Sequence, residues 1–172
     1  MIKKDDKIFV AGHNGLVGTA VLRALQKKKF KNIITISRKD LDLFDQKKVN
    51  LFLKKKKPKI VIISAAKVGG IKANNNYKAD FIRENLQIQI NLIHGCHINN
   101  IDKIIFLGSS CVYPKDCNLP IKENYFQQKL TFSQISISYL FFMNIFFLLI
   151  FAFLEKLKMP YRKELIMVTI LY

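Results

Sequence analysis

A glycine-rich stretch near the start of the chain constrains the fold more than any other feature. Residues 8–11 form a short apolar run, glycines follow at positions 12, 15 and 18, and a helical pattern begins at Leu16. A strand, a glycine turn and a helix in this order suit the pyrophosphate of a dinucleotide, because the turn brings backbone N–H groups and a helix N-terminus close to it. An ordinary strand-to-helix turn is the alternative.

Three further apolar runs predict strands at residues 33–36, 60–63 and 103–107, with helical segments between them. Strands alternating with helices indicate a parallel sheet built from βαβ crossovers. The predicted fold is therefore an α/β, Rossmann-type, doubly wound parallel sheet. It is truncated after about four strands and followed by an apolar helical C-terminal tail.

Ser37 and Arg38 follow the second strand, at the point where a dinucleotide fold meets the adenosine ribose. An acidic side chain here favours NAD, whereas a small hydroxyl residue and an arginine suit a 2′-phosphate. We therefore predict NADP as the cofactor. Asp42 can accept a bond from the adenine amino group or can simply be a turn aspartate, and Asp45 can cap the next helix.

Small residues follow the third strand, in a segment that we expect to be a cofactor-side loop, residues 64–76. Small side chains at the carboxyl end of a parallel strand let a cofactor lie against the backbone. A long helix is predicted over residues 80–99. Its expected apolar stripe comprises Phe81, Ile82, Leu86, Ile90 and Ile93, and its histidines, at positions 94 and 97, are interpreted as structural.

The chain carries 29 Lys and Arg against 12 Asp and Glu, a formal net charge of +17. The lysine runs at 27–29 and 54–57 fall at predicted helix C-termini, where the helix dipole favours cations, so no nucleic-acid partner is expected. The 3 cysteines have no metal-ligand spacing and are interpreted as reduced thiols of a cytoplasmic protein. No signal peptide is predicted before the first strand.

Four segments together resemble the GDP-L-fucose synthase family of extended short-chain dehydrogenases/reductases. They read GHNGLVG (12–18), AAKVGGIKAN (65–74), ADFIRENL (79–86) and FLGSSCVYPK (106–115), and the likeness covers about residues 7–125. The resemblance implies an NADPH-dependent epimerase/reductase that acts on GDP-4-keto-6-deoxy-D-mannose. The sugar would be epimerised at C3 and C5, and its C4 ketone would be reduced.

The same resemblance implies site residues. Ser109 would hydrogen-bond the C4 oxygen of the sugar, and Cys111 would be an acid/base of the epimerisation. The glycine turn would hold the pyrophosphate, Arg38 the 2′-phosphate, and Asp42 with Leu43 the adenine. The residues implied in cofactor binding are Gly12, His13, Asn14, Gly15, Leu16, Val17, Gly18, Arg38, Asp42, Leu43, Ala65, Ala66, Leu107, Gly108, Ser109 and Ser110. No metal site is predicted.

One family element is not found at its expected place. The family has a Tyr-x-x-x-Lys pair after the catalytic serine, in which tyrosine donates a proton and lysine lowers the pKa of that tyrosine. Tyr125 and Lys129 match the pattern too close to Ser109, and Tyr139 stands at about the right distance with Met143 in place of lysine. The catalytic dyad of the family is therefore not encoded at the expected position, and the chain as written is expected to be inactive or weakly active.

The sequence changes character after residue 125, so we divide it into an NADP-binding part, 1–125, and a divergent apolar tail, 126–172. Residues 130–154 contain no charged side chain. A frameshift, a retained intron or a truncated gene model would explain the tail; a membrane tail anchor or a helix folded back on the sheet are the alternatives. The family forms homodimers, which the divergent tail makes doubtful for this chain.

Overall fold

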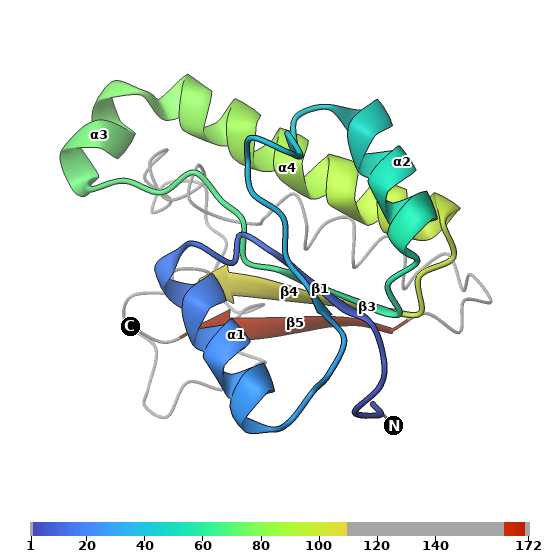
Figure 1. Ribbon diagram of the computed structural model, residues 1–172. Coiled ribbons are helices and arrows are strands. Elements are labelled where there is room, and N and C mark those ends of the chain that lie inside the picture. The colour runs from blue at the N-terminus through green and yellow to red at the C-terminus, as the bar shows by residue number, and fades with distance from the viewer. Residues whose placement is uncertain (1, 110–163, 171–172) are drawn as a thin grey trace, which may run out of the picture. The chain divides into compact units, whose positions relative to one another are not determined.

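The computed structural model describes residues 2–109 and 164–170 (Figure 1). The chain divides into two compact units, which are described separately. Of the described residues, the first contains 2–68, 83–107 and 164–168, and the second contains 69–82, 108–109 and 169–170. The elements are β1 (Ile8–Ala11), α1 (Leu16–Lys27), β2 (Ile33–Ile34), α2 (Gln46–Lys56), β3 (Ile60–Ile63), α3 (Ile71–Asn76), α4 (Lys78–Ile98), β4 (Lys103–Ser109) and β5 (Glu164–Ile170).

The strands form one sheet in the order β2-β1-β3-β4-β5. The pairs β1–β2, β1–β3 and β3–β4 are all parallel, with Phe9 opposite Val61 and Val61 opposite Ile104. The predicted parallel α/β fold is thus confirmed for the first four strands. The fifth strand differs from the prediction for residues 126–172, which was a divergent apolar tail. The predicted uncharged helical stretch, 130–154, lies outside the described residues.

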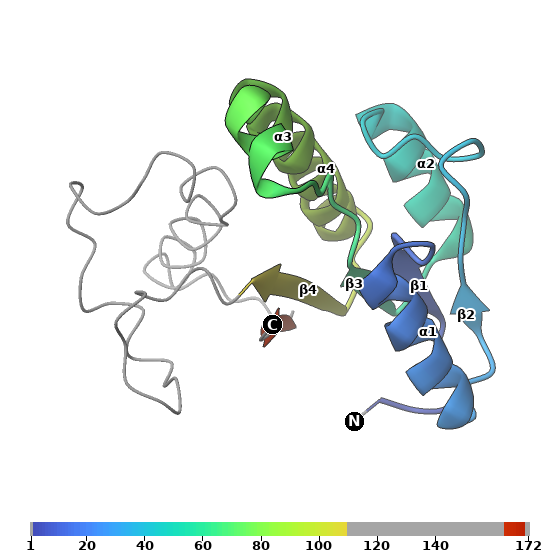
Figure 2. The ribbon, with the colours of Figure 1, turned by 90° about the vertical axis from the view of Figure 1, so that its left-hand side faces the viewer.

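Helices cover the sheet of the first unit from both sides. Figure 1 shows α2 and α4 above the strands and α1 on the other side, and Figure 2 shows the same layers from the end of the sheet. Because successive side chains of a strand point to opposite faces of the sheet, each strand packs against the helices on both sides. Ile8, Val10, Ile60 and Ile62 form one buried cluster against which Val21 and Leu25 of α1 pack. This double burial explains why β1 and β3 read as continuous apolar runs.

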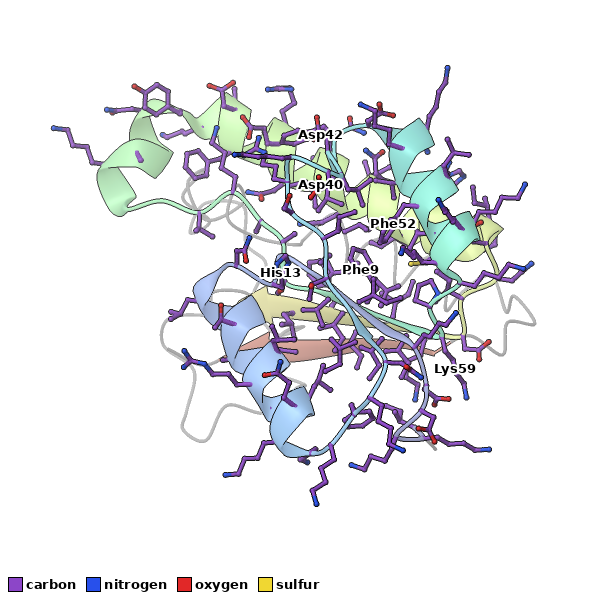
Figure 3. The ribbon with its side chains drawn as sticks, viewed as in Figure 1. Phe9, His13, Asp40, Asp42, Phe52 and Lys59 are labelled. Carbon is purple, nitrogen blue, oxygen red and sulfur yellow. The ribbon has the colours of Figure 1, made fainter. Side chains whose placement is uncertain are left out.

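The opposite face of the sheet packs on α2 and α4. The rings of Phe9 in β1 and Phe52 in α2 lie next to each other, with centroids 4.9 Å apart (Figure 3). Val49 and Leu53 of α2 are fully buried. Gly95 of α4 lets the two helices approach closely, since a Cβ there would lie 2.9 Å from Leu53 Cδ1.

The predicted apolar stripe of α4 is only partly right. Phe81 is buried as expected, but Ile90 is exposed, and the residues that the helix buries in the first unit are Ile88, Leu92 and Cys96, together with Asn91 and Gly95. The helix has two apolar faces. Tertiary packing buries the face that carries Ile88 and Leu92 rather than the predicted face with Ile90.

Two other local expectations were wrong. The second strand ends at Ile34 rather than at residue 36. In the second unit, residues 71–76 form the short helix α3 within the segment expected to be a loop. Asparagine is a poor helix former, so the composition of this segment does not predict a helix. A Cβ at Gly69 would lie 2.8 Å from Phe81 Cζ, so this unit also needs a glycine where its backbone approaches an aromatic ring.

The helix ends of the first unit follow the predicted chemistry. Asp45 is the N-cap of α2, and its Oδ1 accepts a hydrogen bond of 3.0 Å from Lys48 N. Lys27 lies in the last turn of α1, and three lysines, 54, 55 and 56, lie in the last turn of α2. All of them are exposed. In the part of the chain that the structure describes, no helix combines the length and apolar character that crossing a membrane requires.

The cap of α2 makes a prediction about acid stability. The hydrogen bond from Lys48 N lowers the pKa of Asp45 below its ordinary value of 3.8. A lowered pKa in the folded state stabilises the fold above the ordinary value, and this contribution is lost as the pH falls through the lowered one. Asp45→Asn keeps an oxygen that caps the helix but cannot titrate. We expect the free energy of unfolding, measured by urea titration from about pH 6 to pH 2, to fall less steeply with pH in the variant. Equal slopes in the two proteins would contradict this role of Asp45.

Candidate functional site

The turn after β1 is locked by two of its glycines. Gly12 has φ +85°, and a Cβ there would lie 2.6 Å from the N and Cα atoms of Ala65. A Cβ at Gly18 would lie 2.1 Å from Gly12 O. Gly15 N donates to Gly12 O at 3.1 Å, and Thr19 Oγ1 donates to His13 O at 2.9 Å. The packing of the turn on β3 and on α1 therefore requires Gly12 and Gly18.

Gly15 is not required by the packing of the chain. Its φ is −75°, and a Cβ there would meet only Gly12 O, at an ordinary distance of 3.4 Å. It is the N-cap of α1, a helix with no side-chain cap bond and no acidic residue in its first turn. The first N–H groups of a helix need acceptors, and they attract anions. A glycine here leaves open access to those groups.

The carboxyl ends of β1 and β3 are tied together beside this turn. Ser64 donates twice to Ala11 O, from its backbone N at 3.0 Å and from its Oγ at 2.7 Å. Because β2 and β3 lie on opposite sides of β1, the chain reverses direction across the sheet at this point. Ligands of open α/β sheets bind in the crevice at such a switch point.

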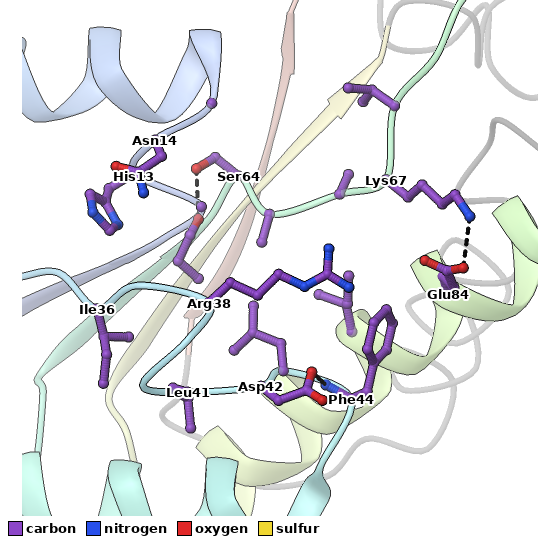
Figure 4. A pocket seen from close by; sticks show the side chains of 18 of the residues that line it. His13, Asn14, Ile36, Arg38, Leu41, Asp42, Phe44, Ser64, Lys67 and Glu84 are labelled. Atoms are coloured by element: carbon purple, nitrogen blue, oxygen red, sulfur yellow. Dashed lines mark hydrogen bonds and ion pairs between the residues drawn. The ribbon is translucent and has the colours of Figure 1, made fainter. Parts of the chain in front are cut away.

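A cavity of about 630 Å³ lies at this switch point, entirely within the first unit (Figure 4). Its lining comes from the glycine turn, the segment after β2, the exit of β3 and one side of α4. The lining residues are Phe9, Ala11, Gly12, His13, Asn14, Gly15, Ile36, Arg38, Leu41, Asp42, Leu43, Phe44, Ser64, Ala65, Ala66, Lys67, Val68, Glu84 and Ile88.

Arg38 brings a cation to this cavity from the segment after β2. Its guanidinium carbon lies 5.5 Å from the centroid of the Phe44 ring, and the side chain is exposed. Ser37 does not offer a free hydroxyl donor, because its Oγ donates to Asp40 Oδ2 at 2.6 Å. Asp42 Oδ1 accepts a bond of 3.0 Å from Phe44 N, which is the turn role that we considered. The arginine is thus the group of this segment best placed for an anion.

A second cation lines the cavity as part of an ion pair. Lys67 Nζ lies 2.7 Å from Glu84 Oε1, and Arg83 Nη2 lies 3.7 Å from the same oxygen. The hydrogen bond from Lys67, helped by the charges of Lys67, Arg83 and Arg38, lowers the pKa of Glu84 against an opposing effect of burial. Glu84 is therefore ionised at neutral pH.

Two asparagines of α4 hold segments of the cavity wall, and sequence reasoning missed both. Asn85 Oδ1 accepts from Lys67 N at 2.7 Å, and its Nδ2 donates to Lys67 O at 3.0 Å. Asn91, fully buried, donates to Leu43 O at 2.8 Å and to Phe44 O at 2.9 Å. The sequence signal for such a role was an asparagine between apolar residues of a long helix, because a buried amide needs hydrogen-bond partners.

The cavity brings together most, but not all, of the residues predicted for the cofactor. Those that line it are Gly12, His13, Asn14, Gly15, Arg38, Asp42, Leu43, Ala65 and Ala66. Leu16, Val17 and Gly18 do not line it, and Leu16 is exposed on α1. Leu107 packs against the core cluster on the α1 side, and Gly108 and Ser109 end β4.

The remaining predicted groups cannot be placed in the same way. Ser110, Cys111, Tyr125, Lys129 and Tyr139 all lie outside the described residues. His94 bonds Gln46 Nε2 through its Nδ1 at 3.0 Å, which agrees with a structural role. In residues 2–109 and 164–170, no group of three His, Cys, Asp or Glu side chains could hold a metal ion.

Comparison with known proteins identifies the family. The model of the NAD dependent epimerase/dehydratase family matches residues 8–139. The chain belongs to this family. It is also a homologue of GDP-L-fucose synthases: it is 52% identical to GDP-L-fucose synthase 1 of Arabidopsis thaliana over 124 residues, which cover 72% of this chain and 38% of the relative. The GDP-L-fucose synthase of Escherichia coli (strain K12) is 43% identical over 118 residues, 69% of this chain and 37% of that protein.

The fold has close matches among solved structures. MlghC, the GDP-mannoheptose C4 reductase from Campylobacter jejuni with NADP bound, superposes with a TM-score of 0.80 at 34% identity. The superposition covers 99% of this chain and 49% of that protein. The chain thus spans less than two fifths of the length of the synthases that it matches by sequence and about half of this structural relative.

The two kinds of glycine in the turn predict different effects on stability. Gly18→Ala forces a methyl group onto Gly12 O, so we expect a loss of about 2–3 kcal/mol in the free energy of unfolding. Gly15→Ala has space for its methyl group and loses at most about 1 kcal/mol, from the weaker N-cap. Urea unfolding of the two variants beside the parent chain measures both. Equal losses would show that the turn does not pack as described.

Proposed function

We propose that this chain is the NADPH-binding part of an epimerase/reductase like GDP-L-fucose synthase, acting on GDP-4-keto-6-deoxy-D-mannose. The observation that carries the proposal is the open glycine turn at the switch point, with Arg38 lining the same cavity. The 52% identity to a GDP-L-fucose synthase supports the choice of substrate, as does a structural relative that reduces a GDP-sugar at C4.

The residues of the cavity fit such a cofactor. In the proposed complex, the N–H groups of the turn and of the start of α1 hold the pyrophosphate, and Arg38 holds the 2′-phosphate. Asp42 and Leu43 flank the adenine, and the small side chains of Ala65 and Ala66 let the dinucleotide approach the exit of β3. When bound, NADPH supplies the hydride that reduces a ketone.

Side chains at and after the end of β4 would act on the sugar. In the proposed function, Ser109 hydrogen-bonds the C4 oxygen, and Cys111 moves a proton at the carbons next to the ketone. In the proposed function, this segment also contacts the cofactor through Leu107, Gly108 and Ser110. The order of the sheet supports this role, since β4 lies next to β3 and parallel to it, so both end at the same edge.

Proton donation is the weak step of the proposed reaction. Met143 stands where a lysine would lower the pKa of Tyr139, and methionine carries neither a charge nor a hydrogen-bond donor. We therefore propose that this chain binds NADPH and turns over little.

Two measurements on the purified chain test the proposed function. NADPH titration is expected to show saturable binding, and incubation with GDP-4-keto-6-deoxy-D-mannose and NADPH is expected to give NADPH oxidation near the level of the enzyme-free control. Absence of NADPH binding would overturn the cofactor assignment. Clear oxidation with formation of GDP-L-fucose would overturn the proposed low activity while keeping the enzyme class.

Arg38 predicts the choice between cofactors. Arg38→Met removes a charge-assisted bond to the 2′-phosphate, so we expect Kd for NADPH to rise about tenfold or more and Kd for NADH to change by less than about threefold. Arg23→Met is the matched control, because Arg23 is an exposed arginine of α1 that does not line the cavity. Fluorescence titration with each cofactor gives the four constants. An equal loss for both cofactors in Arg38→Met would argue against a 2′-phosphate contact.

A further inference from the structure

The charged groups that line the cavity nearly cancel one another. Besides His13, they are two cations, Arg38 and Lys67, and two carboxylates, Asp42 and Glu84. A pocket for a cofactor with several phosphate charges is expected to offer a positive surplus. Asp42 is tied into its own turn through Phe44 N. Glu84 is instead paired with the side chains of Lys67 and Arg83.

Glu84 is firmly held among cations. Its side chain is 17% exposed, and its Oε1 is 2.7 Å from Lys67 Nζ. Arg38 adds its attraction from the segment after β2, and Figure 4 shows Arg38, Lys67 and Glu84 around the same space. The carboxylate thus neutralises positive charge that would otherwise attract an anion in the cavity.

The backbone of Lys67 is fixed independently of this ion pair. Asn85 binds both its N and its O, so the position of Lys67 on the cavity wall does not depend on Glu84. Neutralising Glu84 is therefore expected to make the net charge of the cavity lining more positive while leaving the cavity wall in place.

We propose that Glu84 is a specificity-determining residue of the cofactor cavity, which limits the preference for a 2′-phosphorylated dinucleotide by pairing with Lys67. The proposal rests on the proposed NADPH-binding function and deepens it. NADPH differs from NADH by one phosphate, so any added positive potential in the cavity favours NADPH more than NADH. Glu84 acts through Lys67 and Arg38 and does not itself need to touch the cofactor.

The test is the ratio of Kd for NADH to Kd for NADPH in the full chain. In Glu84→Gln the ratio is expected to rise about threefold or more, and the rise should shrink at high salt. Lys67→Met, which keeps the backbone bonds to Asn85, is expected to lower the ratio. The double variant should return to within about twofold of the parent, because both charges of the pair are then gone. Glu84→Asp keeps the charge and should keep the ratio.

Asp102→Asn is the matched control for the loss of one negative charge. Asp102 precedes β4 at the opposite edge of the sheet and does not line the cavity. An unchanged ratio in Glu84→Gln, an equal rise in Asp102→Asn, or a double variant that keeps the ratio of Glu84→Gln would overturn the proposal. Failure of the parent chain to bind NADPH would instead overturn the proposed function, so the two failures are distinguishable. Thermal unfolding of each variant separates these outcomes from loss of the fold.

Discussion

The contact between the carboxyl ends of β1 and β3 is the constraint on which the rest of the site depends. Ser64 gives both its donors to Ala11 O, and Gly12 turns where the backbone of Ala65 leaves no space for a side chain. β2 and β3 lie on opposite sides of β1 in the sheet. The segments that follow β1 and β3 therefore move apart beyond the contact between the carboxyl ends of these two strands. One close approach of two backbones therefore creates both the floor of the cavity and its opening.

The side of the cavity opposite α1 depends on polar groups of α4. Asn85 fixes the exit of β3 and Asn91 fixes the segment after β2, each by binding backbone groups of a loop rather than its side chains. Gln87 Nε2 donates to Asn91 Oδ1 at 2.8 Å, so the buried amide uses its acceptor as well as its donors. Buried amides are costly unless fully bonded, so these contacts hold two surface segments at defined positions on an otherwise apolar interface.

Local physical chemistry explains what could be predicted from the sequence. Strands β1 and β3 are buried on both faces and read as apolar runs, Gly12 is required by a positive φ, and Asp45 caps α2 by accepting a hydrogen bond from the backbone N–H three residues ahead. The predictions that failed depend on distant partners. Whether α4 buries Ile90 or Leu92 is decided by the sheet and by α2, and the roles of Glu84, Asn85 and Asn91 depend on segments far away in the sequence. No periodicity within one segment contains that information.

Cofactor binding and chemistry are separable along this chain in the proposed function. Every residue that lines the cavity belongs to Met1–Val68 or Arg83–Leu107 of one compact unit, whereas the proposed acid/base and proton-donor groups follow β4. In the proposed complex, phosphate binding would rely on backbone N–H groups that the packing of Gly12 and Gly18 already fixes. Proton transfer relies on a tyrosine whose pKa a neighbouring cation must lower. In the proposed function, methionine at position 143 would therefore weaken proton transfer and leave the phosphate-binding glycine turn unchanged.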